Sequence, residues 1–197
     1  YEMSASLVGS EMCIRDRTHI FMPNIDSTTI EAMLSACSVY KGYCFPMIGL
    51  HPTSVNANYE KELEIVAREL KFSKEYVAIG EIGMDLYWDK TYLKEQQIVL
   101  DKQVNWALEY DLPIVIHCRD AFDYIYKVLE PYKKTPLRGI FHSFTGTAEE
   151  ATRVLEFSDF FIGINGVVTF KKSHLPEILA GIPLEKIVLE TDSPYLT

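Results

Sequence analysis

Seven short apolar runs recur along this chain at steps of 23 to 36 residues, and six of them end in a polar residue. A strand plus a helix that crosses back to a parallel neighbour needs a step of about this length. The runs are continuously apolar rather than alternating, which is typical of parallel strands covered on both faces. The six residues at the run ends are His51, Glu81, His117, His142, Asn165 and Asp192.

This alternation predicts an α/β fold of the TIM (β/α)8-barrel type, in which the carboxyl ends of all strands meet at one mouth and build the active site there. We expect strands at 18–23, 45–50, 76–80, 113–117, 138–142, 160–164 and 186–190. We expect helices at 27–40, 59–72, 92–110, 121–132 and near 174–181, and another that begins at a capping box from Thr147 to Glu150.

The two ends of the chain do not fit this pattern. Residues 1–17 show no strand or helix period, and we interpret them as a non-native segment that precedes a single domain at 18–197. A closed barrel has eight strands, whereas the sequence supplies seven runs and no helix after the last one. The sequence therefore predicts a truncated barrel that lacks its first strand and its last helix.

The composition, with 48% apolar and 24% charged residues, is that of an ordinary globular protein. The net charge of −9 argues against a protein that coats nucleic acid with positive charge, but it allows a nuclease that holds one phosphate through cations. No apolar stretch approaches the roughly 18 residues of a membrane span. Four cysteines without a CxxC pair are typical of reduced thiols, so we expect a cytoplasmic protein with no membrane partner.

Two carboxylates and two histidines at the strand ends form a candidate metal site. Taken alone, His117 and His142 could be satisfied core residues, and Glu81 and Asp192 could simply begin a loop or turn. Independent core histidines would not fall in phase with the strand–helix repeat, so we predict that all four converge. Imidazole and carboxylate without thiolate suit one or two divalent cations such as Zn, Mn or Mg. Asp192 and Glu81 are then the candidate catalytic carboxylates, with Asp192 as the base for a bound water.

Other polar groups near the same mouth are candidates for substrate binding. His51 and Arg119 could hold a phosphate, although a surface ion pair is the alternative for Arg119. Asp85 is expected in the loop after the third strand and is the third candidate. Tyr87 and Trp88 of that loop could stack on a base or sugar, or pack against the barrel rim.

Five segments of the chain together resemble the TatD-like metal-dependent deoxyribonucleases of the amidohydrolase superfamily. Their number and order make the resemblance specific, and it extends from Thr18 to Thr197. The segments are Gly-Leu-His-Pro (49–52), Gly-Glu-Ile-Gly-Met-Asp (80–85), Ile-His-Cys-Arg-Asp (116–120), Phe-His-Ser-Phe-Thr-Gly (141–146) and Glu-Thr-Asp-Ser-Pro-Tyr-Leu (190–196).

The resemblance implies a TIM barrel with one or two divalent cations that hydrolyses phosphodiester bonds of DNA, often from the 3′ end of single strands. It implies that Glu81 is shared by two metals, that His117 and His142 complete one site, and that Asp192 belongs to the other. DNA is therefore the expected partner, RNA stays open, and no obligate protein partner is inferred. The chain departs from the family in one motif, because it has no counterpart of the Asp-Thr-His-x-His sequence of the family's first strand.

Two other interpretations stay open. A hydrolase on the same barrel could act on a carboxylic or aminoacyl ester or on an amide, since a fold does not fix its substrate. A chain without the His-x-His pair could also be an inactive fragment that only binds metal. Activity on a nitrophenyl phosphodiester compared with a nitrophenyl ester would separate the two kinds of hydrolase.

Overall fold

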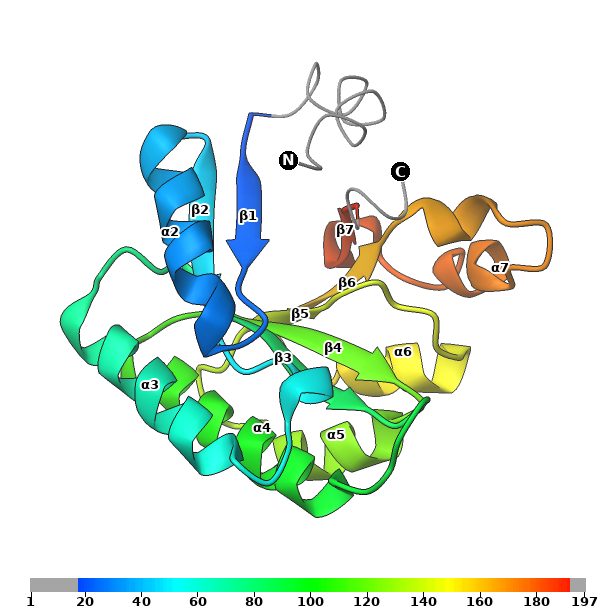
Figure 1. Ribbon diagram of the computed structural model, residues 1–197. Coiled ribbons are helices and arrows are strands. Elements are labelled where there is room, and N and C mark those ends of the chain that lie inside the picture. Colours follow the sequence, from blue (N-terminus) through cyan, green and yellow to red (C-terminus); the bar gives the residue numbers. More distant parts are fainter. Residues whose placement is uncertain (1–17, 192–197) are drawn as a thin grey trace.

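The computed structural model describes residues 18–191, which form one sheet of seven parallel strands with helices packed against it (Figure 1). Each strand pairs with the next one along the chain. This sequential parallel order is that of a (β/α) barrel wall, so the predicted fold class is confirmed. The strands are β1 (Ile20–Pro23), β2 (Cys44–Ile48), β3 (Ala78–Asp85), β4 (Ile114–Arg119), β5 (Gly139–Phe141), β6 (Phe160–Ile164) and β7 (Ile187–Leu189).

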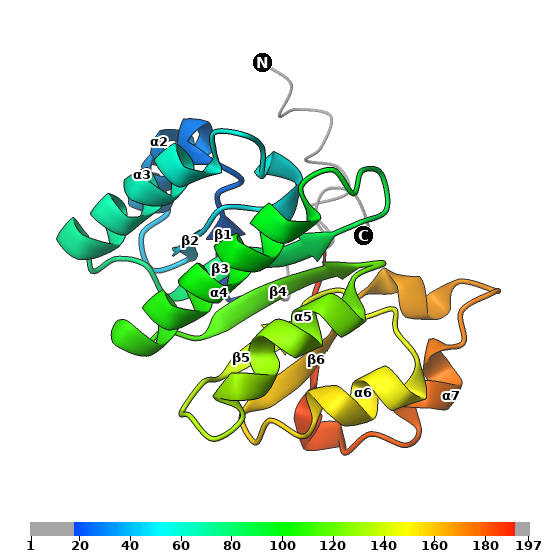
Figure 2. The ribbon, with the colours of Figure 1, turned by 90° about the horizontal axis from the view of Figure 1, so that it is seen from below.

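Helices connect consecutive strands, and four of them, α3 to α6, lie in succession along the outer side of the sheet (Figures 1 and 2). None of the helices in the described part of the chain combines the length and apolar character needed to cross a membrane. The α-helices are α2 (Ile30–Val39), α3 (Tyr59–Phe72), α4 (Leu93–Glu109), α5 (Phe122–Leu129), α6 (Ala148–Val154) and α7 (Leu175–Leu179). Short 3-10 helices are η1 (Ser27–Thr29), η2 (Pro52–Ser54), η3 (Glu130–Tyr132), η4 (Gly166–Thr169) and η5 (Leu184–Lys186).

Local sequence signals account for the helix boundaries and for the faces that the helices bury. At the start of α6 the Thr147 side chain accepts a hydrogen bond from the Glu150 N–H, and the Glu150 side chain accepts one from the Thr147 N–H. This is the predicted capping box. In α3, the apolar residues Leu63, Val66 and Leu70 are buried, and their spacing of three and four places them on one face.

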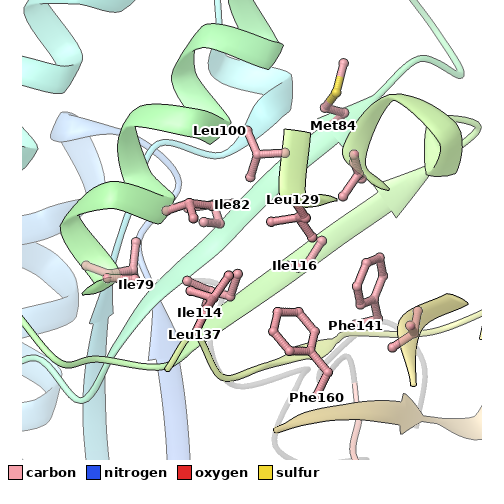
Figure 3. Close-up of a cluster of buried hydrophobic side chains, with 14 of the residues drawn as sticks. Ile79, Ile82, Met84, Leu100, Ile114, Ile116, Leu129, Leu137, Phe141 and Phe160 are labelled. Carbon is pink, nitrogen blue, oxygen red and sulfur yellow. The ribbon is translucent and has the colours of Figure 1, made fainter. Parts of the chain in front are cut away.

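The main core lies between the middle strands and the helices outside them. Ile82 of β3 and Ile116 of β4 are fully buried, as is Leu100 of α4 (Figure 3). Phe141 of β5 and Phe160 of β6 continue this layer, with ring centroids 6.1 Å apart. Each fully buried apolar side chain of this size stabilises the fold by about 1.5–3 kcal/mol. The core therefore fixes the strands whose ends carry the candidate site.

The third strand is longer than the sequence analysis predicted. We expected it to end at residue 80, but β3 continues to Asp85, so the predicted loop position of Asp85 is wrong. The pairing of β3 with β4 shifts in register between Ile79 and Ile82. Gly83 then adopts a φ of 142°, and a Cβ atom there would lie 2.0 Å from a backbone oxygen of β4. The sequence needs glycine at this point because only glycine permits both the φ angle and the close approach.

Within residues 18–191 the sheet does not close on itself, because β1 and β7 each pair with a single neighbour. Both end strands are exposed at their outer residues, with Phe21 60% and Leu189 83% exposed. The described residues thus form an open, incomplete barrel. The predicted non-native segment 1–17 lies outside the described residues, and its assignment stays a prediction.

Candidate metal centre

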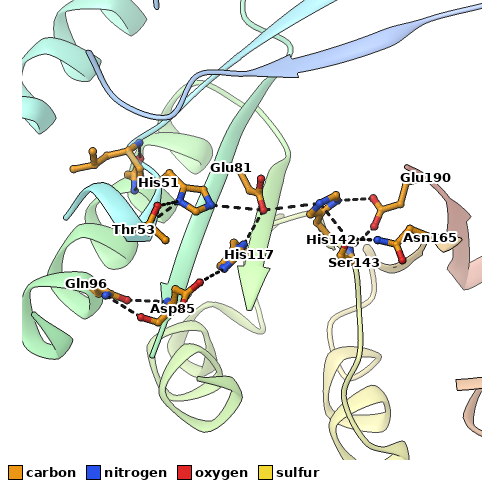
Figure 4. A network of polar contacts seen from close by, with 12 residues as sticks. His51, Thr53, Glu81, Asp85, Gln96, His117, His142, Ser143, Asn165 and Glu190 are labelled. Carbon is orange, nitrogen blue, oxygen red and sulfur yellow. Dashed lines mark hydrogen bonds and ion pairs between the residues drawn. The ribbon is translucent and has the colours of Figure 1, made fainter. Parts of the chain in front are cut away.

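Three histidines surround one carboxylate at the carboxyl ends of the strands (Figure 4). Glu81 lies within β3 and His117 within β4, while His51 and His142 follow β2 and β5. The Glu81 Oε1 atom lies 3.0 Å from His117 Nδ1 and 3.9 Å from the Nε2 atoms of His51 and His142. The structure therefore brings together four side chains that are up to 91 positions apart in sequence. We refer to these four residues as the histidine–glutamate cluster.

Two of the imidazoles have a carboxylate on the ring nitrogen that points away from Glu81. His117 Nε2 lies 2.9 Å from Asp85 Oδ2, and His142 Nδ1 lies 2.9 Å from Glu190 Oε2. A carboxylate on the outer nitrogen holds the imidazole proton there. With the outer nitrogen protonated, the inner nitrogen can offer its lone pair to a metal. For His117 this requires that the metal displaces the proton that Nδ1 shares with Glu81 Oε1.

The third imidazole is held by a threonine. His51 Nδ1 lies 2.6 Å from the Thr53 hydroxyl oxygen and 3.2 Å from the Thr53 backbone nitrogen, and which of the two it bonds to depends on the tautomer of the ring. For His51 to bind a cation through Nε2, its Nδ1 proton must be donated to the hydroxyl oxygen of Thr53, which the shorter of the two contacts allows. The His51 ring is thereby fixed in orientation, as are the rings of the other two histidines.

The donor set fits a divalent cation. The ligand atoms offered by His51, Glu81 and His117 all lie within 4.8 Å of one another. Metal–ligand bonds of about 2.0–2.2 Å to nitrogen and oxygen place one ion between donors that far apart after small side-chain movements. Imidazole with carboxylate suits Zn, Mn, Fe or Co, and it suits Mg when water completes the shell. Figure 4 shows His142 on the side of Glu81 opposite to His51, where Glu81 could be shared with a second cation.

Burial and mutual contact set the charges of this cluster. Burial opposes ionisation of Glu81, but the hydrogen bond with His117 and the charges of the imidazoles outweigh it and lower the pKa of Glu81. Burial also disfavours protonation of His117, yet contact with Glu81 and Asp85 outweighs it and raises the pKa of His117. For His51 burial dominates and lowers its pKa to about 4. Near neutral pH the cluster therefore offers an ionised carboxylate and a neutral His51, as metal binding requires.

Buried amide side chains hold the strand ends that carry the cluster. Gln96 Oε1 accepts the backbone N–H of the last β3 residue at 2.9 Å, and Gln103 Oε1 accepts the Leu50 N–H at 2.7 Å. The Asn24 side chain bonds to both the N–H and the carbonyl of Gly49, each at 2.8 Å. The sequence analysis missed these residues. The signal was two glutamines seven positions apart on the apolar stripe of α4, where polar side chains need a specific partner.

The structure places the remaining predicted site residues in different surroundings. Asp192, the predicted ligand and base, lies outside the described residues. Asp85 was predicted to contact substrate, but its side chain is only 5% exposed and faces His117. Glu190 was not predicted, although it ends the last apolar run in phase with the other strand ends. Arg119 is the last residue of β4 and is exposed, so it stays a candidate for phosphate binding.

A cavity of about 290 Å³ opens beside His142, near the ends of β4 and β5. Its lining includes three acidic residues, Asp120, Asp123 and Glu150. One of them is compensated, because Asp123 Oδ1 lies 2.6 Å from Arg153 Nη1. The remaining negative charge disfavours a phosphate group in this cavity.

The comparisons with known proteins point to one family. The family model for TatD related DNase matches residues 4–197. The chain is 35% identical over 179 residues to the uncharacterized metal-dependent hydrolase YabD of Bacillus subtilis (strain 168), a match that covers 90% of this chain and 69% of that protein. It is 36% identical over 159 residues to the 3′-5′ ssDNA/RNA exonuclease TatD of Pantoea sp. (strain At-9b), covering 80% of this chain and 60% of that protein.

A solved structure agrees with the fold. The crystal structure of YJJV, a TatD homolog from Escherichia coli K12, superposes with a TM-score of 0.86 at 28% identity and covers 98% of this chain and 74% of that one. The chain thus spans 60% to 69% of the length of the two curated relatives named above. These comparisons confirm the family that the sequence motifs predicted, and the incomplete barrel.

Proposed function

This chain belongs to the TatD related DNase family, and on that premise we propose that it hydrolyses phosphodiester bonds of DNA with a bound divalent cation. We propose further that it removes nucleotides from the 3′ end of single strands. The name of the Pantoea relative, which describes a 3′-5′ exonuclease on single-stranded DNA and RNA, supports this finer assignment. Because the chain spans only part of its relatives, its activity is itself part of the proposal.

The histidine–glutamate cluster is the observation that carries the proposal. Three imidazole nitrogens lie within 3.9 Å of one oxygen of Glu81. Each ring has a separate partner on its outer nitrogen, namely Asp85, Glu190 or Thr53. A set of satisfied core histidines would not need three inner nitrogens turned toward the same carboxylate oxygen. We therefore assign a ligand role to His51, which the sequence analysis had placed with the substrate-binding groups.

When bound, a divalent cation supplies Lewis-acid chemistry that stabilises charge on a phosphate oxygen and makes water more acidic. His51, Glu81 and His117 would hold this ion. Asp85 keeps the proton of His117 on Nε2, so that Nδ1 presents its lone pair to the ion. This orienting role replaces the substrate contact that we had expected for Asp85.

Residues at the edge of the cluster would act on the substrate and on water. Glu190 accepts the His142 Nδ1 proton, which leaves His142 Nε2 facing Glu81 and the reacting group. Arg119 would hold the phosphate through its guanidinium N–H groups. Asp192, which follows Glu190 by two positions, would accept a proton from the water that attacks phosphorus.

The printed sequence has five histidines, and none is separated from another by a single residue. The first-strand His-x-His pair that the resemblance implied is therefore not in this chain. We accordingly propose one well-defined cation position, on His51, Glu81 and His117. Imidazole-rich coordination favours Mn or Zn over Mg at this position.

The test is release of nucleotides from 3′-labelled single-stranded DNA by the full chain, with Mn, Zn or Mg added to chelator-treated protein. Glu81→Gln and Asp192→Ala should each lower the rate by at least about 100-fold, since each removes a proposed ligand or base. Glu64→Gln, which changes an exposed carboxylate on α3, is the matched control and should cut like the parent chain. Cation-independent cutting, or cutting that survives Glu81→Gln, would overturn the proposal.

The second candidate function is metal binding without catalysis, and the missing His-x-His pair favours it. A chain that binds Mn but cuts neither DNA nor bis-nitrophenyl phosphate would support this alternative. Hydrolysis of a nitrophenyl carboxylic ester without hydrolysis of the phosphodiester would instead support an ester or amide hydrolase on the same barrel.

A further inference from the structure

Two large aromatic side chains stand exposed directly after β3. Tyr87 is 51% and Trp88 is 78% exposed, although both follow a strand that is largely buried. Their rings meet edge to face, with centroids 4.7 Å apart and planes 88° to each other. Because Trp88 contacts Tyr87 edge to face and stays so exposed, a broad part of its indole surface faces solvent.

The positively charged side chain of Arg119 completes this surface. The Arg119 guanidinium carbon lies 3.9 Å from the centroid of the Tyr87 ring and 5.8 Å from that of the Trp88 ring. Among the described residues, the guanidinium takes part in no hydrogen bond or ion pair, and it contacts these two rings. A guanidinium that contacts aromatic rings through its face keeps its N–H groups, which lie in the guanidinium plane, available to bind an anion. We call Tyr87, Trp88 and Arg119 the aromatic platform.

The backbone ties the aromatic platform to the histidine–glutamate cluster. Asp85 holds His117 with one carboxylate oxygen and accepts the Tyr87 N–H with the other, at 3.1 Å. Arg119 is the register partner of Asp85 across the β3–β4 pair, and its carbonyl accepts the Leu86 N–H at 2.9 Å. The platform is thus fixed next to the cluster, at the carboxyl ends of the same two strands.

Charge makes this the side by which an anionic chain could approach. The cavity beside His142 carries acidic residues, whereas Arg119 offers an unpaired positive charge within the described residues. The whole chain nevertheless carries a net charge of −9, so general attraction cannot hold a polyanion. Affinity on this side must therefore come from contacts with the rings together with one phosphate contact.

We propose that the aromatic platform binds the nucleotide next to the scissile phosphate of a single-stranded nucleic acid, with its base stacked on Trp88 and its phosphate held by Arg119. This inference rests on the proposed nuclease function and deepens it. Stacking requires a base whose face is free, so the platform selects single strands over duplex and tolerates any base. The single cationic contact predicts a weak salt dependence, with a slope of log K against log salt of about −0.7.

Tryptophan fluorescence tests the proposal without catalysis. The chain has two tryptophans, so Trp106→Phe leaves Trp88 as the only one. This chain, in excess chelator, is titrated with single-stranded oligothymidylate, with an abasic oligomer of equal length and charge, and with a blunt duplex. We expect the single strand to quench Trp88 and the other two to bind at least about fivefold more weakly.

Variants made in the full chain that keeps Trp106 then separate base stacking from non-specific binding. Their affinity is measured by the fluorescence anisotropy of a labelled oligothymidylate. Trp88→Ala should raise Kd by about 5- to 100-fold, and Trp88→Phe should restore most of the loss. Arg119→Gln should remove the salt dependence. The control is Phe72→Ala, which removes an equally exposed ring, 77% exposed with Lys71 Nζ 5.7 Å from its centroid, at the far end of α3.

Equal binding of abasic and normal oligomers, or a Kd unchanged by Trp88→Ala, would overturn the platform. The experiments distinguish failure of the platform from failure of the nuclease proposal. Quenching of Trp88 without any cutting of DNA would leave the platform standing and remove the proposed activity. Metal-dependent cutting that Trp88→Ala does not alter would support the nuclease proposal and exclude the platform.

Discussion

Asp85→Asn should weaken binding of a divalent cation without changing any proposed ligand. The carboxylate of Asp85 accepts two hydrogen bonds, one from His117 Nε2 at 2.9 Å and one from the Tyr87 N–H at 3.1 Å. An amide of the same shape has only one oxygen. Whichever way it turns, one of the two donors loses its acceptor and faces an NH2 group instead.

The size of the effect follows from burial. The Asp85 side chain is 5% exposed, so water cannot replace the lost acceptor. A buried donor left unsatisfied costs about 1–3 kcal/mol. If the lost bond is that of His117, its proton is free to move to Nδ1, the nitrogen that faces Glu81, and the lone pair for the cation is lost. Changes of this kind raise the Kd for metal about 10- to 100-fold.

Calorimetric titration of chelator-treated protein with Mn or Zn measures this Kd, and urea unfolding in chelator measures the stability of the metal-free chain. Asp101→Asn is the matched control, because Asp101 also accepts a hydrogen bond, from the Tyr132 hydroxyl at 2.7 Å, but on the exposed surface. A Kd for Asp85→Asn within twofold of the parent, with the chain folded, would refute the argument that Asp85 orients a ligand.

Three further predictions concern metal linkage, the backbone and pH. Mn at 100 times its Kd should raise the free energy of unfolding of the parent chain by about 2.7 kcal/mol, as measured by urea titration. The same Mn concentration should raise it by almost nothing in Glu81→Gln. Equal increases in the two chains would exclude Glu81 as a ligand. Gly83→Ala should destabilise the fold by about 3 kcal/mol or more, because the new Cβ would lie 2.0 Å from the His117 carbonyl oxygen. Gly42 also has a positive φ, but a Cβ at Gly42 would have no atom within 4 Å. Gly42→Ala is therefore the control and should cost only about 1 kcal/mol. The Thr28 hydroxyl, which bonds to Asp26, is the main reason that the pKa of Asp26 is lowered. A lowered carboxyl pKa contributes stability above the unfolded value of about 3.9, and this stability is lost as pH falls through the folded value. The parent chain should therefore lose stability relative to Asp26→Asn between pH 5 and pH 3, by an amount that solvent screening keeps small. Urea unfolding that shows no change in this difference would contradict the assignment.

The order of strands and helices could be predicted from the sequence because it depends on local patterns. Apolar runs marked all seven strands, and the helix predicted at 59–72 agrees with α3 at both ends. The capping box at Thr147 fixed the start of α6 for the same reason, since its two hydrogen bonds join residues three apart.

The length of β3 and the contacts of the site depend on residues far apart in sequence, and local patterns do not reveal them. The apolar run predicted that the strand ends at residue 80, but pairing with β4 extends it to Asp85. The partners of the imidazoles could not be predicted from local sequence patterns for the same reason. Glu190 meets His142 across 48 positions, and only the folded sheet places them together.

The most direct test of the central claim is the position of the metal. Crystals of the full chain soaked in Mn would be measured near the Mn absorption edge, where an anomalous difference peak locates the ion. We predict a peak within about 2.5 Å of Glu81 Oε1, His51 Nε2 and His117 Nδ1. An anomalous peak elsewhere, or none at this cluster in Mn-saturated crystals, would contradict the assignment of these residues as a metal centre.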